Sequence, residues 1–186
     1  RARLAAGENV LVIGGGPIGM LVALAARQVG AKVTISEVNE NRLALAREMG
    51  FTALNPVDVD VAEAVSEATG SKGADVVFEV SGTQPGVDLM TKAAATRGRI
   101  CMVAIHAQKP QIDLFQFFWR ELNLIGARVY EPEDYEKAIQ IVTSGGVDAD
   151  TVITDIAPLA NIQQAFEALD RSPSALKSLI KIGADG

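Results

Sequence analysis

A glycine-rich turn between an apolar strand and an apolar helix constrains this chain more than any other stretch. Residues 10–13, Val-Leu-Val-Ile, favour a β-strand and run directly into the Gly-x-Gly-x-x-Gly segment 14–19. An alanine-rich helical pattern follows over residues 20–26. In this order of strand, turn and helix, the glycine pattern predicts a dinucleotide-binding site.

Each glycine of the pattern has a physical task. Gly14 lets the chain turn sharply off the strand, Gly16 lets a pyrophosphate approach the backbone, and Gly19 lets the helix pack closely on the sheet. Pro17 costs little in the first helical turn, because its missing N–H would have had no intrahelical partner. The free N–H groups and the helix dipole then point at the phosphates. We therefore predict that the pyrophosphate is bound by Gly14, Gly16, Pro17 and Ile18. A tight turn with only a structural role is the alternative.

An acidic residue completes the pattern. Residues 32–36 predict a second strand, and Glu37 ends it eighteen residues after Gly19. A carboxylate there can accept hydrogen bonds from both hydroxyls of an adenosine ribose, and it repels a 2′-phosphate. The sequence thus predicts NAD as the cofactor, the alternative for Glu37 being a solvated acid at the start of a helix. Arg42 lies either over the adenine or at the surface.

Strand and helix patterns alternate through the first 128 residues. Helices end at glycines such as Gly30, Gly50 and Gly70, and Pro85 opens a helix that reaches Ala95. The expected strands cover residues 10–13, 32–36, 51–54, 76–78, 99–105 and 122–127. This alternation favours right-handed βαβ units. We predict an α/β fold with a doubly wound six-stranded parallel sheet, the Rossmann fold, in the order 3-2-1-4-5-6. The cofactor then lies in the crevice between strands one and four.

Composition excludes several other classes of protein. The net charge of −6, with acids and bases interspersed, predicts no nucleic-acid partner. A single cysteine excludes an internal disulfide and a cysteine-rich zinc motif. No apolar run reaches the roughly 18 residues that cross a bilayer, and no signal peptide opens the chain, so we expect no membrane association and a cytoplasmic location.

The two ends of the chain are less regular. Residues 1–4 have the composition of the end of a helix, so we expect a fragment of a longer polypeptide that lacks its N-terminal part. Past residue 128 the pattern weakens, and the expected elements are a helix, a strand, a helix and a strand over residues 132–143, 151–154, 158–170 and 176–182. This tail is too short to form a domain of its own.

Several segments resemble one known family. Residues 14–19, the strand that ends at Glu37, residues 42–50 and residues 75–82 resemble the coenzyme domain of medium-chain zinc-dependent alcohol dehydrogenases. Within that family they are most similar to the polyol branch, which includes sorbitol, butanediol and threonine dehydrogenase-like enzymes. Residues 119–130 are similar to butanediol dehydrogenase-like members in particular.

The resemblance implies different roles for two parts of the chain. Residues 1–128 would be the NAD-binding domain, and residues 129–186 the C-terminal part of a catalytic domain whose N-terminal part, with the zinc ligands, is absent. The nicotinamide half of NAD would be lined by Val80, Ser81, Val103, Ala104, Ile105, Ala127, Arg128 and Val129. Zinc would be bound by the full-length enzyme but not by this chain. Strand 122–125 would join subunits into a homodimer or homotetramer.

The leading hypothesis is the NAD-binding part of a zinc-dependent dehydrogenase that oxidises a small secondary alcohol or polyol by hydride transfer to NAD. The alternative is a non-catalytic dinucleotide-binding or sensing module. We predict no activity for this chain alone and assign it no catalytic or metal-binding residue. Cys101 is interpreted as a packed core thiol, and His106 as a loop histidine, with a proton relay as its alternative. The aromatic residues of 115–119 are expected to pack a core or a subunit contact.

Overall fold

The computed structural model describes residues 1–171 and 176–183. The chain divides into two compact units, Arg1–Pro132 and Glu133–Gly186. None of the helices in the described ranges has the length and hydropathy needed to cross a bilayer.

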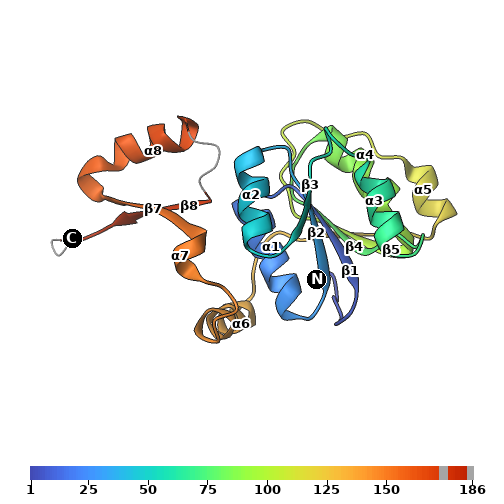
Figure 1. Cartoon of the computed structure of the whole chain (residues 1–186), viewed down its shortest axis with the longest axis horizontal. Helices are drawn as coiled ribbons and strands as arrows, with labels where there is room; N and C mark the ends of the chain where they lie inside the picture. Colours follow the sequence, from blue (N-terminus) through green and yellow to red (C-terminus); the bar gives the residue numbers. More distant parts are fainter. Residues whose placement is uncertain (172–175, 184–186) are drawn as a thin grey trace. The chain divides into compact units, whose positions relative to one another are not determined.

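The first unit is built on one parallel sheet of six strands in the order β3-β2-β1-β4-β5-β6 (Figure 1). The strands are β1 (Asn9–Ile13), β2 (Lys32–Ser36), β3 (Thr52–Leu54), β4 (Ala74–Glu79), β5 (Ala94–Met102) and β6 (Asn123–Gly126). The order reverses between β1 and β4, as predicted. The expectation of a doubly wound Rossmann-type sheet is therefore confirmed.

Five helices connect these strands: α1 (Pro17–Gln28), α2 (Glu40–Glu48), α3 (Val61–Ala68), α4 (Gln84–Ala93) and α5 (Leu114–Trp119). Four of them are capped by a side chain that accepts a hydrogen bond from a backbone N–H of the first turn. The capping residues are Asn39, Asp60, Thr83 and Asp113. Figure 1 shows α1 and α2 on one side of the sheet and α3 and α4 on the other. Both faces of the central strands are therefore covered.

The core follows the alternation of side chains along β1. Leu11 and Ile13 pack in one cluster with Val65 of α3 and Met90 of α4, and all four are buried. Val10 and Val12, whose side chains point to the other face, are buried as well. A strand that is apolar at successive positions is typical of a parallel sheet covered on both faces.

The boundary between α4 and β5 differs from the prediction. The helix ends at Ala93 rather than Ala95, and β5 starts at Ala94 rather than Arg99. Ala94 is already extended, and the register shifts between Ala74 and Val76 of the neighbouring strand, so the helix passes into the strand without a loop. β5 also ends at Met102, so residues 103–105 follow the strand instead of belonging to it.

The predicted helix end at residues 1–4 was wrong. These residues form no helix, and Arg3 has a positive φ of 50°. The Arg99 guanidinium instead donates hydrogen bonds to the carbonyls of Ala2 and Arg3. The beginning of the described chain is thereby attached to β5.

The second unit pairs two parallel strands, β7 (Ile153–Pro158) and β8 (Lys177–Lys181). Its other elements are α6 (Pro132–Thr143), α7 (Ala149–Val152), the 3-10 turn η1 (Leu159–Asn161) and α8 (Ile162–Arg171). The strand predicted over residues 151–154 begins only at Ile153, because Asp148 caps α7 by accepting hydrogen bonds from Asp150 N and Thr151 Oγ1. Of the segment 129–186, residues 172–175 and 184–186 lie outside the described residues.

Candidate functional site

A cleft of about 1050 Å³ opens at the carboxyl ends of the strands that flank the reversal of strand order. From the predicted site residues, the cleft brings together Gly14, Gly16, Glu37, Arg42, Val80 and Ser81. Two segments that the sequence did not predict for the site also line the cleft. One is the loop 56–60 with the first residue of α3, and the other is the start of α4 with Thr83, Pro85 and Gly86. This is the crevice between β1 and β4 in which we expected the cofactor.

The three glycines that define the Gly-x-Gly-x-x-Gly pattern differ in what surrounds them. A Cβ on Gly19 would lie 1.8 Å from the carbonyl oxygen of Gly14, and a Cβ on Gly14, whose φ is +102°, would lie 3.0 Å from the N atom of Ser81. Neighbouring backbone atoms therefore leave no room for a side chain at these two positions. A Cβ on Gly16 would meet only the end of the Arg42 side chain, at 3.6 Å. Gly16 therefore leaves space in the cleft, as close approach of a phosphate requires.

The N-terminus of α1 is open to a ligand. Gly16 is the N-cap residue and Pro17 the first helical residue. In the part of the chain that the structure describes, no side chain caps this helix. The N–H groups of its first turn, together with the positive end of the helix dipole, form a site suited to an anion.

The Glu37 carboxylate joins the glycine turn to the start of α2. Its side chain is only 6% exposed, so it is not the solvated acid of the alternative interpretation. Oε2 accepts a hydrogen bond of 2.7 Å from Gly15 N, and Oε1 accepts bonds from Val38 N and Asn39 N at 2.8 and 2.9 Å. Oε2 has a second lone pair, which can accept from a ribose hydroxyl.

Arg42 faces the same cleft. Its Nη1 lies 3.8 Å from Glu37 Oε2, and its side chain is about three-quarters buried. Its Nε atom is buried and has no hydrogen-bond partner among residues 1–171 and 176–183. Arg42 is thus held beside the carboxylate and is not a free surface side chain.

Glu79, which sequence reasoning did not single out, connects the ends of β4 and β5. Its backbone oxygen accepts hydrogen bonds from Val103 N and Ala104 N at 2.9 and 3.1 Å. Its fully buried carboxylate accepts bonds from Ser81 N, Ser81 Oγ and Gly82 N. The only signal in the sequence was an acid at the end of an apolar strand, directly before Val-Ser-Gly.

His106 lies in the loop after β5, as expected, but it is not a free loop residue. Its side chain is 12% exposed, and Nε2 lies 3.4 Å from Glu79 Oε2. The neighbouring prediction for Cys101 is confirmed, because this residue is buried in β5, and burial raises the pKa of its thiol.

The remaining predicted residues follow the ends of strands at the same edge of the sheet. Ala127 N donates to Met102 O at 3.0 Å, and a Cβ on Gly82 would lie 2.9 Å from the oxygen of Ile105. The loops after β4, β5 and β6 therefore approach one another. Eight predicted residues do not line the cleft itself: Pro17, Ile18, Val103, Ala104, Ile105, Ala127, Arg128 and Val129.

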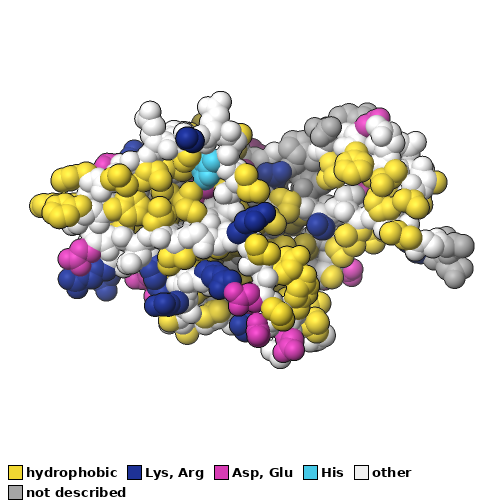
Figure 2. All heavy atoms as spheres, turned by 180° about the vertical axis from the view of Figure 1, so that it is seen from behind, with side chains coloured by type: hydrophobic (Ala, Val, Ile, Leu, Met, Phe, Trp, Pro, Cys, Tyr) yellow, Lys and Arg dark blue, Asp and Glu magenta, His cyan; other side chains and the backbone are white. Residues whose placement is uncertain are grey.

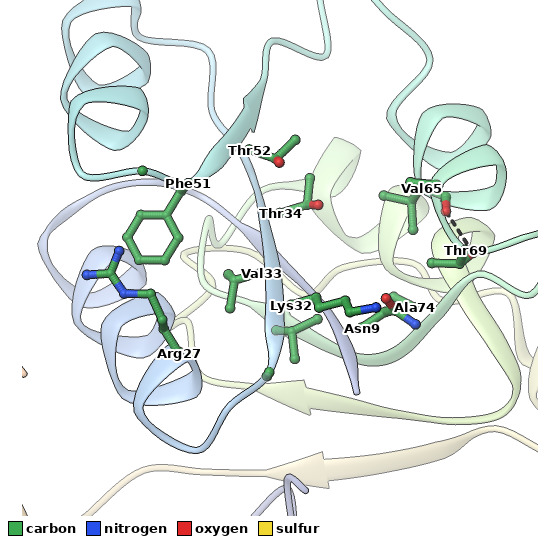
Figure 3. A pocket seen from close by; sticks show the side chains of 14 residues that line it. Asn9, Arg27, Lys32, Val33, Thr34, Phe51, Thr52, Val65, Thr69 and Ala74 are labelled. Carbon is green, nitrogen blue, oxygen red and sulfur yellow. Dashed lines mark hydrogen bonds between the residues drawn. The ribbon is translucent and has the colours of Figure 1, made fainter. Parts of the chain in front are cut away.

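A second hollow of about 370 Å³ lies near the amino ends of β1 and β2 (Figure 3). Arg27 stacks over the ring of Phe51 there, with 4.4 Å between its guanidinium carbon and the ring centre. Lys32 and Asn9 lie on another part of the wall in Figure 3. This hollow is at the edge of the sheet opposite the glycine turn, so it is separate from the candidate site.

The described residues do not fit a zinc site. Among residues 1–171 and 176–183, no group of three or more His, Cys, Asp or Glu side chains could hold a metal ion. A catalytic zinc takes three protein ligands.

Comparison with known proteins places the chain in a family. The family described as "Zinc-binding dehydrogenase" matches residues 17–144, which is more than half of the chain. The chain belongs to the zinc-binding dehydrogenases. The expected resemblance to medium-chain zinc-dependent alcohol and polyol dehydrogenases is thus confirmed.

Individual relatives of this zinc-binding dehydrogenase chain agree with that assignment. The chain is 51% identical over 185 residues to 2-dehydro-3-deoxy-L-galactonate 5-dehydrogenase of Pseudoalteromonas atlantica, covering 100% of the chain and 54% of the relative. It is 34% identical over 182 residues to sorbitol dehydrogenase of Halalkalibacterium halodurans, covering 94% and 52%. Among solved structures, 2R,3R-butanediol dehydrogenase from Bacillus subtilis has a TM-score of 0.92 at 28% identity, covering 98% and 53%. The chain thus spans about half the length of these relatives.

Proposed function

We propose that this chain is the NAD-binding part of a zinc-dependent dehydrogenase that oxidises a secondary alcohol or polyol by hydride transfer to NAD. The observation that carries the proposal is the cleft in which Gly16 leaves space beside the open N-terminus of α1 and Glu37 lies at the end of β2. The relatives that are similar over most of the chain are named as dehydrogenases, which favours this function over a sensing module.

The residues of the cleft fit a dinucleotide. Gly14, Gly16, Pro17 and Ile18 would hold the pyrophosphate at the start of α1. Glu37 would accept a hydrogen bond from the adenosine ribose, and Arg42 would contact the adenine. When bound, NAD supplies a nicotinamide carbon that accepts a hydride. The task of this chain is then to bind the cofactor and to orient its ring.

The nicotinamide half would lie toward the loops that follow β4, β5 and β6. Val80 and Ser81 would contact it from the first loop, residues 103–105 from the second, and residues 127–129 from the third. Because Glu79 O holds the N–H groups of Val103 and Ala104, the backbone of these loops is already fixed. A fixed backbone can hold the carboxamide and select one face of the ring.

The substrate class follows from the relatives. The relative at 51% identity is named for the 5-dehydrogenation of 2-dehydro-3-deoxy-L-galactonate, and another is named for sorbitol. We therefore propose a polyhydroxylated small molecule as the substrate, with a sugar acid as the first choice. The identity of 51% over the full chain favours the sugar acid over sorbitol, for which the identity is 34%.

The proposal also covers the division of the chain, its assembly and its location. Residues 1–128 would bind the cofactor, and residues 129–186 would contribute to a catalytic domain whose zinc ligands belong to another part of the protein. The β6 edge would pair with a second copy, giving a homodimer or homotetramer. We expect this protein to act in the cytoplasm.

Binding and activity test the proposal separately. Titration calorimetry should show that the 186-residue chain binds NAD. A longer polypeptide that includes this chain and the zinc ligands should form NADH with 2-dehydro-3-deoxy-L-galactonate and should form less with sorbitol. A chain that binds no NAD would refute the cofactor site, and NAD binding without turnover by the longer protein would favour a sensing module.

A further inference from the structure

We propose that Glu79 and His106 form a positioning pair, which fixes the backbone of the loops after β4 and β5 for the nicotinamide half of NAD. The proposal rests on the function proposed above. It assigns His106 a role through Glu79 and not as a group that touches the substrate.

Glu79 holds the two loops with different atoms. Its backbone oxygen accepts from Val103 N and Ala104 N, the first residues after β5. Carboxylate oxygen Oε1 accepts from Ser81 N and Gly82 N, in the loop after β4. One residue therefore anchors four N–H groups from two loops that lie on neighbouring strands.

The second carboxylate oxygen faces His106. Oε1 of Glu79 accepts three hydrogen bonds shorter than 3.2 Å, whereas Oε2 has only a longer contact of 3.4 Å with Gly82 N. His106 Nε2 lies 3.4 Å from the same Oε2. Glu79 has no exposed surface. Burying a carboxylate is costly unless donor or cationic groups face it, and the imidazole of His106 lies within ion-pair distance of Oε2.

His106 also connects the loops by its place in the chain. It follows Ile105, whose oxygen is so close to Gly82 that a Cβ on this glycine would lie 2.9 Å from it. The ring of His106 lies near the carboxylate of Glu79, at the end of β4. The pair thus crosses from the loop after β5 to the end of β4.

The position of the ring argues against a proton relay. Nε2 of His106 is buried and has no hydrogen-bond partner among the described residues, and it faces Glu79 Oε2 at 3.4 Å. His106 is not among the residues that line the cleft. The histidine, cyan in Figure 2, therefore acts through Glu79 and not by contact with a ligand in the cleft.

The adenosine and nicotinamide halves of the site should respond differently to a change at His106. Gly16 and Glu37 follow β1 and β2, and Arg42 lies in α2. In the described part of the chain, none of the hydrogen bonds and ion pairs of these residues involves Glu79 or His106. Loss of the histidine should displace only the loops after β4 and β5. Binding of NAD should then weaken, while binding of ADP-ribose, which lacks the nicotinamide, should not.

The experiment measures NAD and ADP-ribose affinities of the 186-residue chain by titration calorimetry. For His106→Ala we expect NAD to bind about tenfold more weakly and ADP-ribose to bind as in the parent chain. His106→Gln, which keeps an N–H donor in reach of Glu79, should restore most of the NAD affinity. Lys109→Ala changes an exposed side chain of the same loop and should leave both affinities unchanged.

Each result decides between the two proposals. A parent chain that binds neither ligand refutes the proposed function. A parent chain that binds both, with a His106→Ala variant that loses both equally or loses neither, refutes the positioning pair alone. Retained ADP-ribose affinity also shows that the variant is folded. Failure of His106→Gln to recover NAD affinity would contradict the role of the N–H donor.

Discussion

The backbone N–H of Gly15 donates a 2.7 Å hydrogen bond to the carboxylate of Glu37. This bond joins the glycine turn after β1 to the acid at the end of β2. The two are also in close contact, because a Cβ on Gly15 would lie 3.2 Å from the Cβ of Glu37. Glu37 therefore stabilises the conformation of the turn in addition to presenting an acceptor to the cleft.

The first prediction is a preference for NAD over NADP. A 2′-phosphate would meet the Glu37 carboxylate, and the ribose would lose a hydrogen bond to it. We expect NADP to bind more weakly by about 2–4 kcal/mol, from the lost bond and the repulsion of like charges. Titration calorimetry with both cofactors measures this difference. Equal affinities would contradict the role of Glu37 in the ribose site.

The second prediction compares two glycines of the same turn. Gly16→Ala adds a Cβ that faces the cleft, so we expect it to weaken NAD binding and to change stability by less than about 0.5 kcal/mol. Gly19→Ala places a Cβ 1.8 Å from the backbone oxygen of Gly14 and should destabilise the fold by about 1–3 kcal/mol. Calorimetry and urea unfolding measure the two effects. Unchanged NAD affinity in Gly16→Ala would place the pyrophosphate elsewhere.

Much of the fold could be predicted because its signals are local. The strand order of the six-stranded sheet follows from the alternation of strands and helices, since right-handed crossovers leave few topologies open. Gly14, Gly16 and Glu37 were found because a short strand–turn–helix pattern fixes their spacing. Their positions at one cleft follow from that topology.

The parts that were missed depend on contacts between distant residues. Glu79 and His106 are 27 positions apart, and no periodic pattern connects an acid at a strand end with a histidine in a later loop. The cleft wall at residues 56–60 is formed by a loop whose apolar side chains, such as Val57, carry no motif. The start of β5 at Ala94 was missed because alanine favours a helix, so residues 93–95 were predicted to continue α4.

The third prediction concerns the thiol of Cys101. Burial raises its pKa above the ordinary value of 9.0, so the native protein should react very slowly with iodoacetamide at pH 8 and quickly after unfolding in urea. Burial favours the protonated thiol in the folded state. The contribution of this thiol to the free energy of unfolding is therefore complete below pH 9.0 and is lost as the pH rises through the raised pKa of the folded state. Mass spectrometry of the alkylated protein measures the reaction. Fast labelling of the native chain would contradict the buried position.

The fourth prediction concerns the edge of the sheet at β6. Leu124 is 45% exposed on this strand, and apolar side chains of α5 gather at the same end of the unit, to the left in Figure 2. An apolar edge without lysine or proline favours pairing with another strand. We expect Leu124→Lys to convert a dimer to a monomer in light scattering.

A matched control for the edge is available in α1. Val29, at the C-terminal cap of this helix, is also 45% exposed but does not lie on a strand edge. Val29→Lys should leave the molecular mass unchanged. A Leu124→Lys variant that stays dimeric would show that subunits associate through another surface.

The last prediction is that the 186-residue chain binds NAD but does not oxidise an alcohol. Zinc sites of this kind need three ligands from cysteine, histidine or carboxylate side chains, and the described residues provide no such group. The sequence contains one cysteine and one histidine. Cys101 is buried in β5, and His106 faces Glu79. An alcohol has a pKa near that of water and keeps its proton at neutral pH unless another group lowers that pKa.

We therefore expect no stoichiometric zinc by elemental analysis and no NADH formation with butanediol, sorbitol or threonine, although NAD binds. Stoichiometric zinc together with turnover would show that this chain supplies ligands that its described residues do not contain.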